Sequence, residues 1–233
     1  LYATLLEINS TGKNVTTVED PVEYVFPGIN QVQTNAKAGL TFATGLKALL
    51  RQDPDTILVG DIRDVDTARI AIQSALTGHF VLSSLHGTDA VAALHRLLDM
   101  GIEAFLVASA IVGVVSQRLL RKTCDNCKEP YTPGAEELAV FRQHSGGSDK
   151  TVFYQGKGCS YCSGTGYRDR IGVYELLRIT PEIRRLIVGW ATTEELRRLA
   201  VAQGMRTMLR EAMQMVDDDI TTIPEVVRTL FAH

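Results

Sequence analysis

The sequence predicts an α/β fold whose sheet is mostly parallel, joined to a cysteine-rich lobe and a small helical subdomain. Three observations support this prediction. Apolar, strand-like segments alternate with amphipathic helical segments over residues 1–121, as in βαβ units. Four cysteines fall in two close pairs within residues 122–170, and residues 171–233 hold one more strand pattern followed by short helical patterns. We expect these three segments to be the domains.

The first segment contains three short runs that we expect to be strands: 15–20 (VTTVED), 56–61 (TILVGD) and 80–84 (FVLSS). Apolar residues recur with helical spacing between and after them, over about 41–51, 66–77 and 89–100. Thr88 is a candidate N-cap for the last of these helices, and Gly78 and Gly101 fit the position after a helix end. Segment 103–118 is apolar, and its period does not separate helix from strand.

The last segment begins with a strand-like run, 171–177, and continues with helical patterns. The sequence TTEE at 192–195 is a helix start signal, because a threonine cap and a glutamate three residues later can bond each other's backbone. Pro224 fits the first turn of a final short helix.

The composition is that of an ordinary globular protein: 233 residues, 45% hydrophobic, 22% charged and a net charge of −3. The acidic balance and the lack of a basic-aromatic stripe argue against nucleic-acid binding, and so against a nucleic-acid-binding zinc ribbon. The longest apolar stretch, 104–115, is shorter than the ~20 residues of a membrane helix. With no secretory signal visible, we expect a cytoplasmic protein.

The cysteines form two C-x-x-C pairs, Cys124 with Cys127 (CDNC) and Cys159 with Cys162 (CSYC). Four thiolates in this spacing make a closed tetrahedral set, which suits structural Zn²⁺. A catalytic zinc is not expected, since four sulfurs leave no open position. Unmetallated or redox-active thiols are the alternative.

Polar side chains follow the ends of the three predicted strands. Glu19 and Asp20 end the first, Asp61 ends the second and His86 comes shortly after the third. Because ligands bind beyond the carboxyl ends of parallel strands, these residues predict a site at that edge. Taken singly, each also fits a structural role, such as a turn acid or a helix cap.

Two arginines have ordinary structural interpretations. Arg51 could simply favour a helix dipole, although it could also reach phosphates, and Arg63 could form an exposed ion pair with Asp64. A phosphate loop would need G-x-x-x-x-G-K-[ST]. Neither Gly-Lys pair of the chain, at 12–13 and 156–157, has that context.

Seven blocks occur in a definite order: TVEDPVEY (17–24), LLRQDPDTILVGDIRD (49–64), SSLHGTDA (83–90), QRLLRKTCDNC (117–127), the CSYC pair, GVYELL (172–177), and GMRTM (204–208) with ITTIPEVVRTL (220–230). Together they resemble the secretion-superfamily hexameric ATPases, in particular the type II secretion and type IV pilus assembly ATPases. The resemblance implies a RecA-like P-loop NTPase core. LYATLL at 1–6 resembles the helix that follows the phosphate loop, which implies a loop just upstream and a truncated, inactive fragment.

The resemblance also implies roles for the strand-end residues in Mg²⁺-dependent ATP hydrolysis. Asp61 would orient the water or its metal, Glu19 would assist at the metal and His86 would lie near the γ-phosphate. The family usually has glutamate where Asp61 stands, and aspartate is about 1.5 Å shorter. Either the backbone compensates or hydrolysis is slow.

Asp20 is implied near the metal and phosphates, and Arg51 and Arg63 at phosphate or subunit-interface contacts. The cysteines match the family's structural zinc ligands: Cys124, Cys127, Cys159 and Cys162. The implied partners are five further copies in a homo-hexamer, an inner-membrane platform protein and the components of a secretion or pilus machine. The protein would then associate peripherally with the inner membrane and drive pseudopilin or pilin assembly. The alternative is a non-catalytic interaction module that acts through the zinc lobe and the helical tail.

Overall fold

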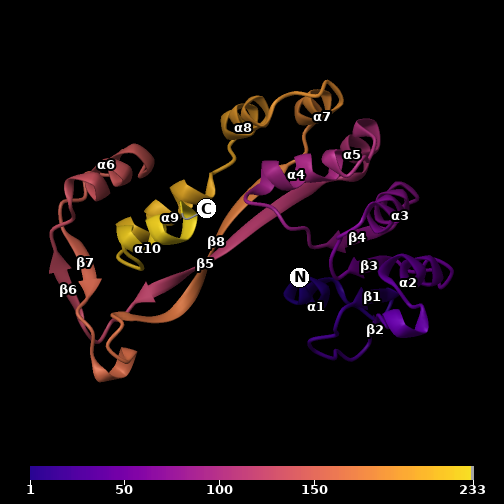
Figure 1. Ribbon diagram of the computed structural model, residues 1–233, viewed down its shortest axis with the longest axis horizontal. Coiled ribbons are helices and arrows are strands. Elements are labelled where there is room, and N and C mark those ends of the chain that lie inside the picture. Colours follow the sequence, from indigo (N-terminus) through magenta and orange to yellow (C-terminus); the bar gives the residue numbers. More distant parts are fainter. Residues whose placement is uncertain (232–233) are drawn as a thin grey trace. The chain divides into compact units, whose positions relative to one another are not determined.

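A computed structural model describes residues 1–231 of the chain. Its contacts group these residues into two compact units (Figure 1). Unit 1 comprises Leu1–Val114 and Arg178–Leu199, and unit 2 comprises Val115–Leu177 and the residues from Ala200 onward. The three segments expected from the sequence divide the chain at other points, and they stay a prediction about its domains.

Unit 1 is built on a four-stranded sheet in the order β2-β1-β3-β4, and every neighbouring pair is parallel. The strands are β1 (Val15–Glu19), β2 (Asn30–Gln33), β3 (Thr56–Val59) and β4 (Phe80–Ser83). Every residue of the two central strands, β1 and β3, is buried, as expected of a parallel sheet covered on both faces. The predicted α/β fold with a parallel sheet is therefore confirmed, and strands β1, β3 and β4 match their predicted positions within two residues.

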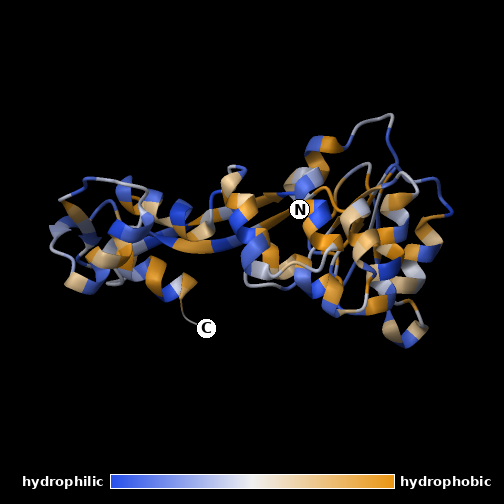
Figure 2. Ribbon diagram, turned by 90° about the horizontal axis from the view of Figure 1, so that it is seen from above, coloured by the Kyte–Doolittle hydropathy of each residue, from blue (hydrophilic) through white to orange (hydrophobic). Residues whose placement is uncertain are grey.

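The helices of unit 1 are α1 (Tyr2–Ile8), α2 (Phe42–Leu49), α3 (Val65–Leu76), α4 (Ala90–Asp99), α5 (Ala104–Ala110), α7 (Pro181–Val188) and most of α8 (Thr193–Ala202). Many helix ribbons in Figure 2 alternate between orange and blue segments, as amphipathic helices with one buried face do. Three of the predicted helices correspond to α2, α3 and α4. The predicted cap of α4 was wrong by one residue, because Asp89 rather than Thr88 accepts the hydrogen bond from Ala92 N at 2.9 Å.

The ambiguous apolar segment 103–118 contains both kinds of structure. Helix α5 ends at Ala110, Ile111 turns to extended backbone, and strand β5 (Gly113–Thr123) follows. The start signal at 192–195 is confirmed, since Thr192 and Glu195 bond each other's backbone N–H at the start of α8.

The described part of unit 2 holds two small sheets, three complete α-helices and the last residues of α8. Strand β5 pairs with β8 (Tyr167–Arg178), and β6 (Lys128–Tyr131) pairs antiparallel with β7 (Phe153–Gly156). The helices are α6 (Ala135–His144), α9 (Met208–Asp217) and α10 (Ile223–Leu230), with Pro224 in the first turn of α10 as predicted. Phe141 and Phe153 join residues of β5, β8, α9 and α10 in one buried apolar cluster.

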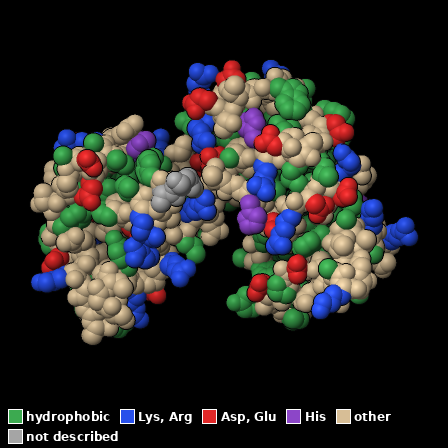
Figure 3. Space-filling view, in the orientation of Figure 1, with side chains coloured by type: hydrophobic (Ala, Val, Ile, Leu, Met, Phe, Trp, Pro, Cys, Tyr) green, Lys and Arg blue, Asp and Glu red, His purple; other side chains and the backbone are tan. Residues whose placement is uncertain are grey.

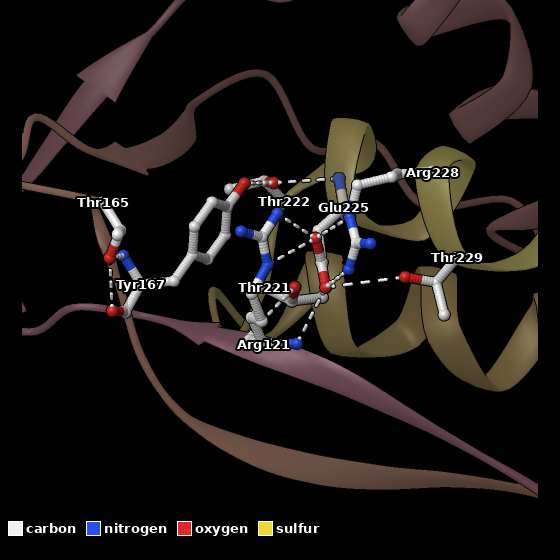
Figure 4. A network of polar contacts seen from close by, with 8 residues as sticks. All are labelled: Arg121, Thr165, Tyr167, Thr221, Thr222, Glu225, Arg228 and Thr229. Carbon is white, nitrogen blue, oxygen red and sulfur yellow. Dashed lines mark hydrogen bonds and ion pairs between the residues drawn. The ribbon is translucent and has the colours of Figure 1, made fainter.

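A buried carboxylate ties α10 to β5 (Figure 4). The side chain of Glu225 has no exposed surface and accepts hydrogen bonds from the Arg121 backbone N–H, from the Arg121 guanidinium at 2.6 and 2.9 Å, and from Arg228 at 2.7 and 2.9 Å. The Arg121 guanidinium also lies 4.2 Å from the ring centre of Tyr167, whose hydroxyl is 2.7 Å from that of Thr222. The carboxylate is therefore paired on both oxygens, as a buried charge must be.

Within residues 1–231 no helix combines the length and the apolar character needed to cross a membrane.

Candidate functional site

The carboxyl ends of β3 and β4 bring three of the predicted site residues together. Asp61, 8% exposed, follows β3. Its Oδ2 lies 2.7 Å from Arg63 Nε and 3.4 Å from His86 Nε2, and Ser84 Oγ lies 3.4 Å from its other oxygen. The predicted convergence of Asp61 and His86 at one edge of the sheet is therefore observed.

The backbone between these residues explains why they converge. Gly60 donates from its N–H to Val18 O at 2.8 Å, so the chain leaving β3 stays beside β1. A Cβ at position 60 would lie 3.2 Å from the Cα of Glu19, closer than most neighbours allow. Ser84 Oγ bonds the carbonyl of Gly60 at 2.6 Å and Ile62 N–H bonds that of Ser84 at 3.0 Å. Glycine at position 60 thus permits the close approach of β1 and β3.

The cluster sets an exposed guanidinium and an exposed imidazole beside a carboxylate. The hydrogen bond to Asp61, together with the charges of Asp61 and Asp20, raises the pKa of Arg63 above its ordinary value. The side chains of Arg63 and His86 are 60% and 77% exposed, so both can turn toward a ligand in solvent. Carboxylate oxygen is a ligand type that Mg²⁺ prefers, and an exposed guanidinium suits phosphate.

Glu19 belongs to a second network beside the first. It is 4% exposed, and its Oε1 accepts hydrogen bonds from Thr17 Oγ1 at 2.5 Å and Gln31 Nε2 at 3.1 Å. Its Oε2 accepts a hydrogen bond from the hydroxyl of Tyr2. An ionised carboxylate offers about four acceptor positions, so three neutral donors leave one on Oε2. Glu19 therefore has one acceptor position left for a water or a metal's water shell.

The remaining predicted residues lie apart from these two networks. Asp20 is exposed after β1, and its charge contributes to the raised pKa of Arg63. Arg51 is exposed just beyond α2, where it lines a shallow pocket with Lys47 and Gln52. Among the described residues no hydrogen bond or ion pair joins Arg51 to Asp61 or Glu19.

The sequence interpretation overlooked four residues that hold the strand-end carboxylates: Tyr2, Thr17, Gln31 and Ser84. Thr17 and Ser84 could have been suspected, since Thr17 lies two residues before Glu19 and Ser84 two residues before His86. Nothing in the sequence alone singles out Tyr2 or Gln31. On the visible face of unit 1, acidic, basic and histidine side chains are intermixed and form no patch of one sign (Figure 3).

The four cysteines form one compact cluster in unit 2. Their sulfurs all lie within 4.8 Å of one another, with three separations of 3.7, 3.8 and 4.0 Å. Zn–S bonds of about 2.3 Å in a tetrahedron would put the sulfurs about 3.8 Å apart. The donor set therefore fits a tetrahedral Zn²⁺, and all four predicted ligands are brought together.

Backbone and side-chain donors point at the sulfurs. Cys162 accepts from the N–H of Cys159 at 3.2 Å and of Gly166 at 3.3 Å, and the former bond above all lowers the pKa of Cys162 to about 6. The Asn126 amide, 3.4 Å from the sulfur of Cys159, lowers the pKa of that thiol. Burial raises the pKa of Cys127 to about 12, although Gly158 N–H lies 3.3 Å from its sulfur. Donors to sulfur stabilise the thiolate form that binds metal.

The sequence matches the family described as "Type II/IV secretion system protein" over residues 1–228. Among similar proteins, the type IV pilus assembly ATPase PilB of Thermus thermophilus is 45% identical over 226 residues, 97% of this chain and 25% of that protein. The type II secretion system protein E of Pseudomonas aeruginosa is 45% identical over 231 residues, 98% of this chain and 45% of that protein. The type II secretion system ATPase E of Vibrio cholerae is 43% identical over 228 residues, 98% of this chain and 45% of that protein.

Two solved structures share the fold. The pilus retraction motor PilT with bound ADP aligns with a TM-score of 0.70 and 26% identity, covering 97% of this chain and 56% of that one. The ATPase DotB of Legionella pneumophila aligns with a TM-score of 0.64 at 20% identity, covering 93% of this chain and 51% of that one. This chain spans less than half the length of the curated relatives it matches. The match over nearly all of its residues shows that the chain belongs to the type II/IV secretion system protein family.

Proposed function

We propose that the full-length protein is a motor ATPase of type II secretion or type IV pilus assembly. It couples ATP hydrolysis to the assembly of pseudopilin or pilin subunits at the inner membrane. The observation that carries the proposal is the cluster of Asp61 with Arg63 and His86 at the carboxyl edge of a parallel sheet. Relatives bearing the names of pilus and secretion ATPases support it.

The strand-end residues fit the needs of phosphoryl transfer to water, which are mainly positioning and charge stabilisation. Asp61 would hold the attacking water or the water shell of Mg²⁺, and Glu19 would accept at its remaining position on Oε2. Arg63 and His86, both close to Asp61, would turn to the γ-phosphate. Bound Mg²⁺ would neutralise charge on the phosphates. Asp20 adds negative charge nearby, and Arg51 would act on phosphate or at a subunit interface.

In this proposal the phosphate loop lies outside residues 1–233, and these residues alone would not hydrolyse ATP. Helix α1 would continue from that loop. In the described part of the sheet the outer edge of β4 is unpaired, and an open edge can accept a further strand. Such a strand would complete a RecA-like core.

The cysteine cluster would hold a structural Zn²⁺, because four sulfurs leave the ion no open position. We place the protein in the cytoplasm as a homo-hexamer that binds an inner-membrane platform protein and the assembly components of the machine. It reaches the inner membrane through those partners and takes no nucleic acid.

One substitution tests the enzymatic part of the proposal. Asp61→Asn in the full-length protein is expected to lower kcat for Mg²⁺-dependent ATP hydrolysis about 100-fold or more, the usual scale for losing a positioned polar group at a transition state. Asp66→Asn is the matched control, since Asp66 is an exposed acid in the first turn of α3.

A full-length protein that binds its partners but hydrolyses no ATP would instead establish the non-catalytic interaction module. Two observations favour that second function: the shorter Asp61, and the three hydrogen bonds that already occupy Glu19. Equal turnover of Asp61→Asn and the wild-type protein would remove Asp61 from the mechanism.

A further inference from the structure

We infer that Tyr2 is a positioning residue that fixes the orientation of the Glu19 carboxylate. The inference rests on the proposed function, in which Glu19 acts at the nucleotide. Its basis is the way the three donors divide between the two carboxylate oxygens. Within residues 1–231, Thr17 and Gln31 bond Oε1, and Oε2 is bonded by Tyr2 alone.

This division makes Tyr2 different in kind from the other two donors. The carboxylate's free acceptor position is on Oε2, so a water or a metal's water shell would meet Glu19 at that oxygen. Loss of Thr17 or Gln31 would leave a second donor on Oε1. Loss of the Tyr2 hydroxyl would leave Oε2 with no protein donor among the described residues, and the direction of its free lone pair would no longer be set.

The hydroxyl of Tyr2 is itself held in place from two sides. It accepts a hydrogen bond from the backbone N–H of Glu23 at 3.1 Å while it donates to Glu19. The ring packs edge-on against Phe26, with 5.0 Å between centroids and 62° between planes. Burial, and then the bond to Glu19, raise the pKa of Tyr2, which keeps the hydroxyl protonated as a donor. The donor position is therefore fixed relative to β1.

Tyr2 also lies on a different element from the residue it holds. It is in the first turn of α1, which packs on the sheet through Leu5, in a buried cluster with Val15 and Leu58. A shift of α1 along the sheet would therefore move the Tyr2 hydroxyl that donates a hydrogen bond to Glu19. In the proposed enzyme α1 continues from the phosphate loop, so this bond would connect the loop to the carboxylate.

The test is a double-mutant cycle in the full-length protein, with Tyr2→Phe, Glu19→Gln and the pair. Tyr2→Phe keeps the ring and is expected to lower kcat for ATP hydrolysis about 10- to 100-fold, the range for one hydrogen bond to a charged group. KM for ATP and the affinity for Mg²⁺-ADP, measured by calorimetry, should change less than about 3-fold. In the Glu19→Gln background, Tyr2→Phe should have no further effect on kcat. Tyr24→Phe is the control, because the hydroxyl of Tyr24 makes no hydrogen bond within residues 1–231.

A second readout does not depend on activity. Tyr2→Phe should lower the urea midpoint of the wild-type protein more than that of Glu19→Gln, which shows direct coupling between the two side chains. Turnover equal to that of Tyr24→Phe, or an equal loss in both backgrounds, would overturn the inference. If Glu19→Gln itself leaves kcat unchanged, the proposed role of Glu19 fails first. If Glu19→Gln is impaired and Tyr2→Phe is not, the positioning role alone fails.

Discussion

Replacing Glu225 with glutamine is expected to destabilise unit 2 by about 2 kcal/mol. Burial would raise the pKa of Glu225, but the hydrogen bonds from Arg228 and Arg121 outweigh it and lower the pKa from 4.5 to about 2. A tenfold change in the acid dissociation constant is worth about 1.4 kcal/mol, so this lowering of the pKa corresponds to about 3 kcal/mol of folding free energy. The side chains of Arg121 and Arg228 are 40% and 57% exposed, so solvent screens part of their attraction to Glu225. The expected loss of stability is therefore about 2 kcal/mol rather than 3. Glutamine would also turn an amide N–H toward two guanidinium groups that cannot accept a hydrogen bond.

Urea unfolding at pH 7, followed by circular dichroism, measures the loss, and hydrogen exchange in peptides from β5 and α10 locates it. Glu129→Gln is the control, since Glu129 is half-exposed and 3.9 Å from Lys157; it should cost less than about 0.5 kcal/mol. Because the pKa of Glu225 is lower in the folded state, its contribution is complete above about pH 4.5 and disappears as the pH falls toward 2. The difference between wild type and Glu225→Gln must therefore narrow on acidification. A Glu225→Gln cost equal to that of the control, or a difference that is constant with pH, would refute the reasoning.

Three further predictions concern the metal, the strand-end acid and a helix end. The full-length protein should carry one Zn²⁺ per chain by elemental analysis and Cys162→Ser should lose it; a folded wild-type protein without metal after expression with zinc would contradict the assignment. Asp61→Glu should raise kcat for ATP hydrolysis by at least about 10-fold if the missing length misplaces the carboxylate, and an unchanged kcat would mean that Asp61 suffices. Trp190→Gly should stabilise the chain by about 0.5–1 kcal/mol in urea unfolding, because Trp190 is 69% exposed and has a φ of 56°, a left-handed conformation that suits glycine. A destabilised Trp190→Gly variant would show that the indole contributes packing despite its exposure.

The fold could be predicted where sequence periodicity and burial agree. The residues of β3, Thr56–Val59, form a mostly apolar run because the strand lies between two others and is buried along its whole length. Strand β2, Asn30–Gln33, has only one apolar residue and forms because β1 offers it a parallel edge. Segment 103–118 could not be assigned, since the change from helix to strand happens inside one apolar run. No strand or helix was predicted in the cysteine lobe, where the structure has β6, α6 and β7.

In the candidate site, the residues at the strand ends could be predicted to converge, because the topology of a parallel sheet brings them together. The ends of parallel strands lie at one edge, so Asp61 and His86 were bound to be neighbours once their strands were recognised. Tyr2 was not predictable, since its contact with Glu19 depends on how α1 packs against the sheet. Arg51 was expected to reach phosphates, but within residues 1–231 no hydrogen bond or ion pair joins it to Asp61 or Glu19.

The packing of the cysteine lobe constrains how this chain could have evolved. Phe141 and Phe153, whose rings meet edge-to-face at 5.0 Å, both come from the stretch between the two cysteine pairs, yet they pack in the same cluster as Met213 and Val216 of α9. A deletion that removed the lobe cleanly would uncover an apolar face on α9, and an uncovered apolar face favours aggregation. Losing the lobe therefore requires a simultaneous change of the terminal helices to a polar surface. The lobe and the terminal helices are thus a single packing unit, in which, among the described residues, neither part has an apolar core of its own that the other does not share.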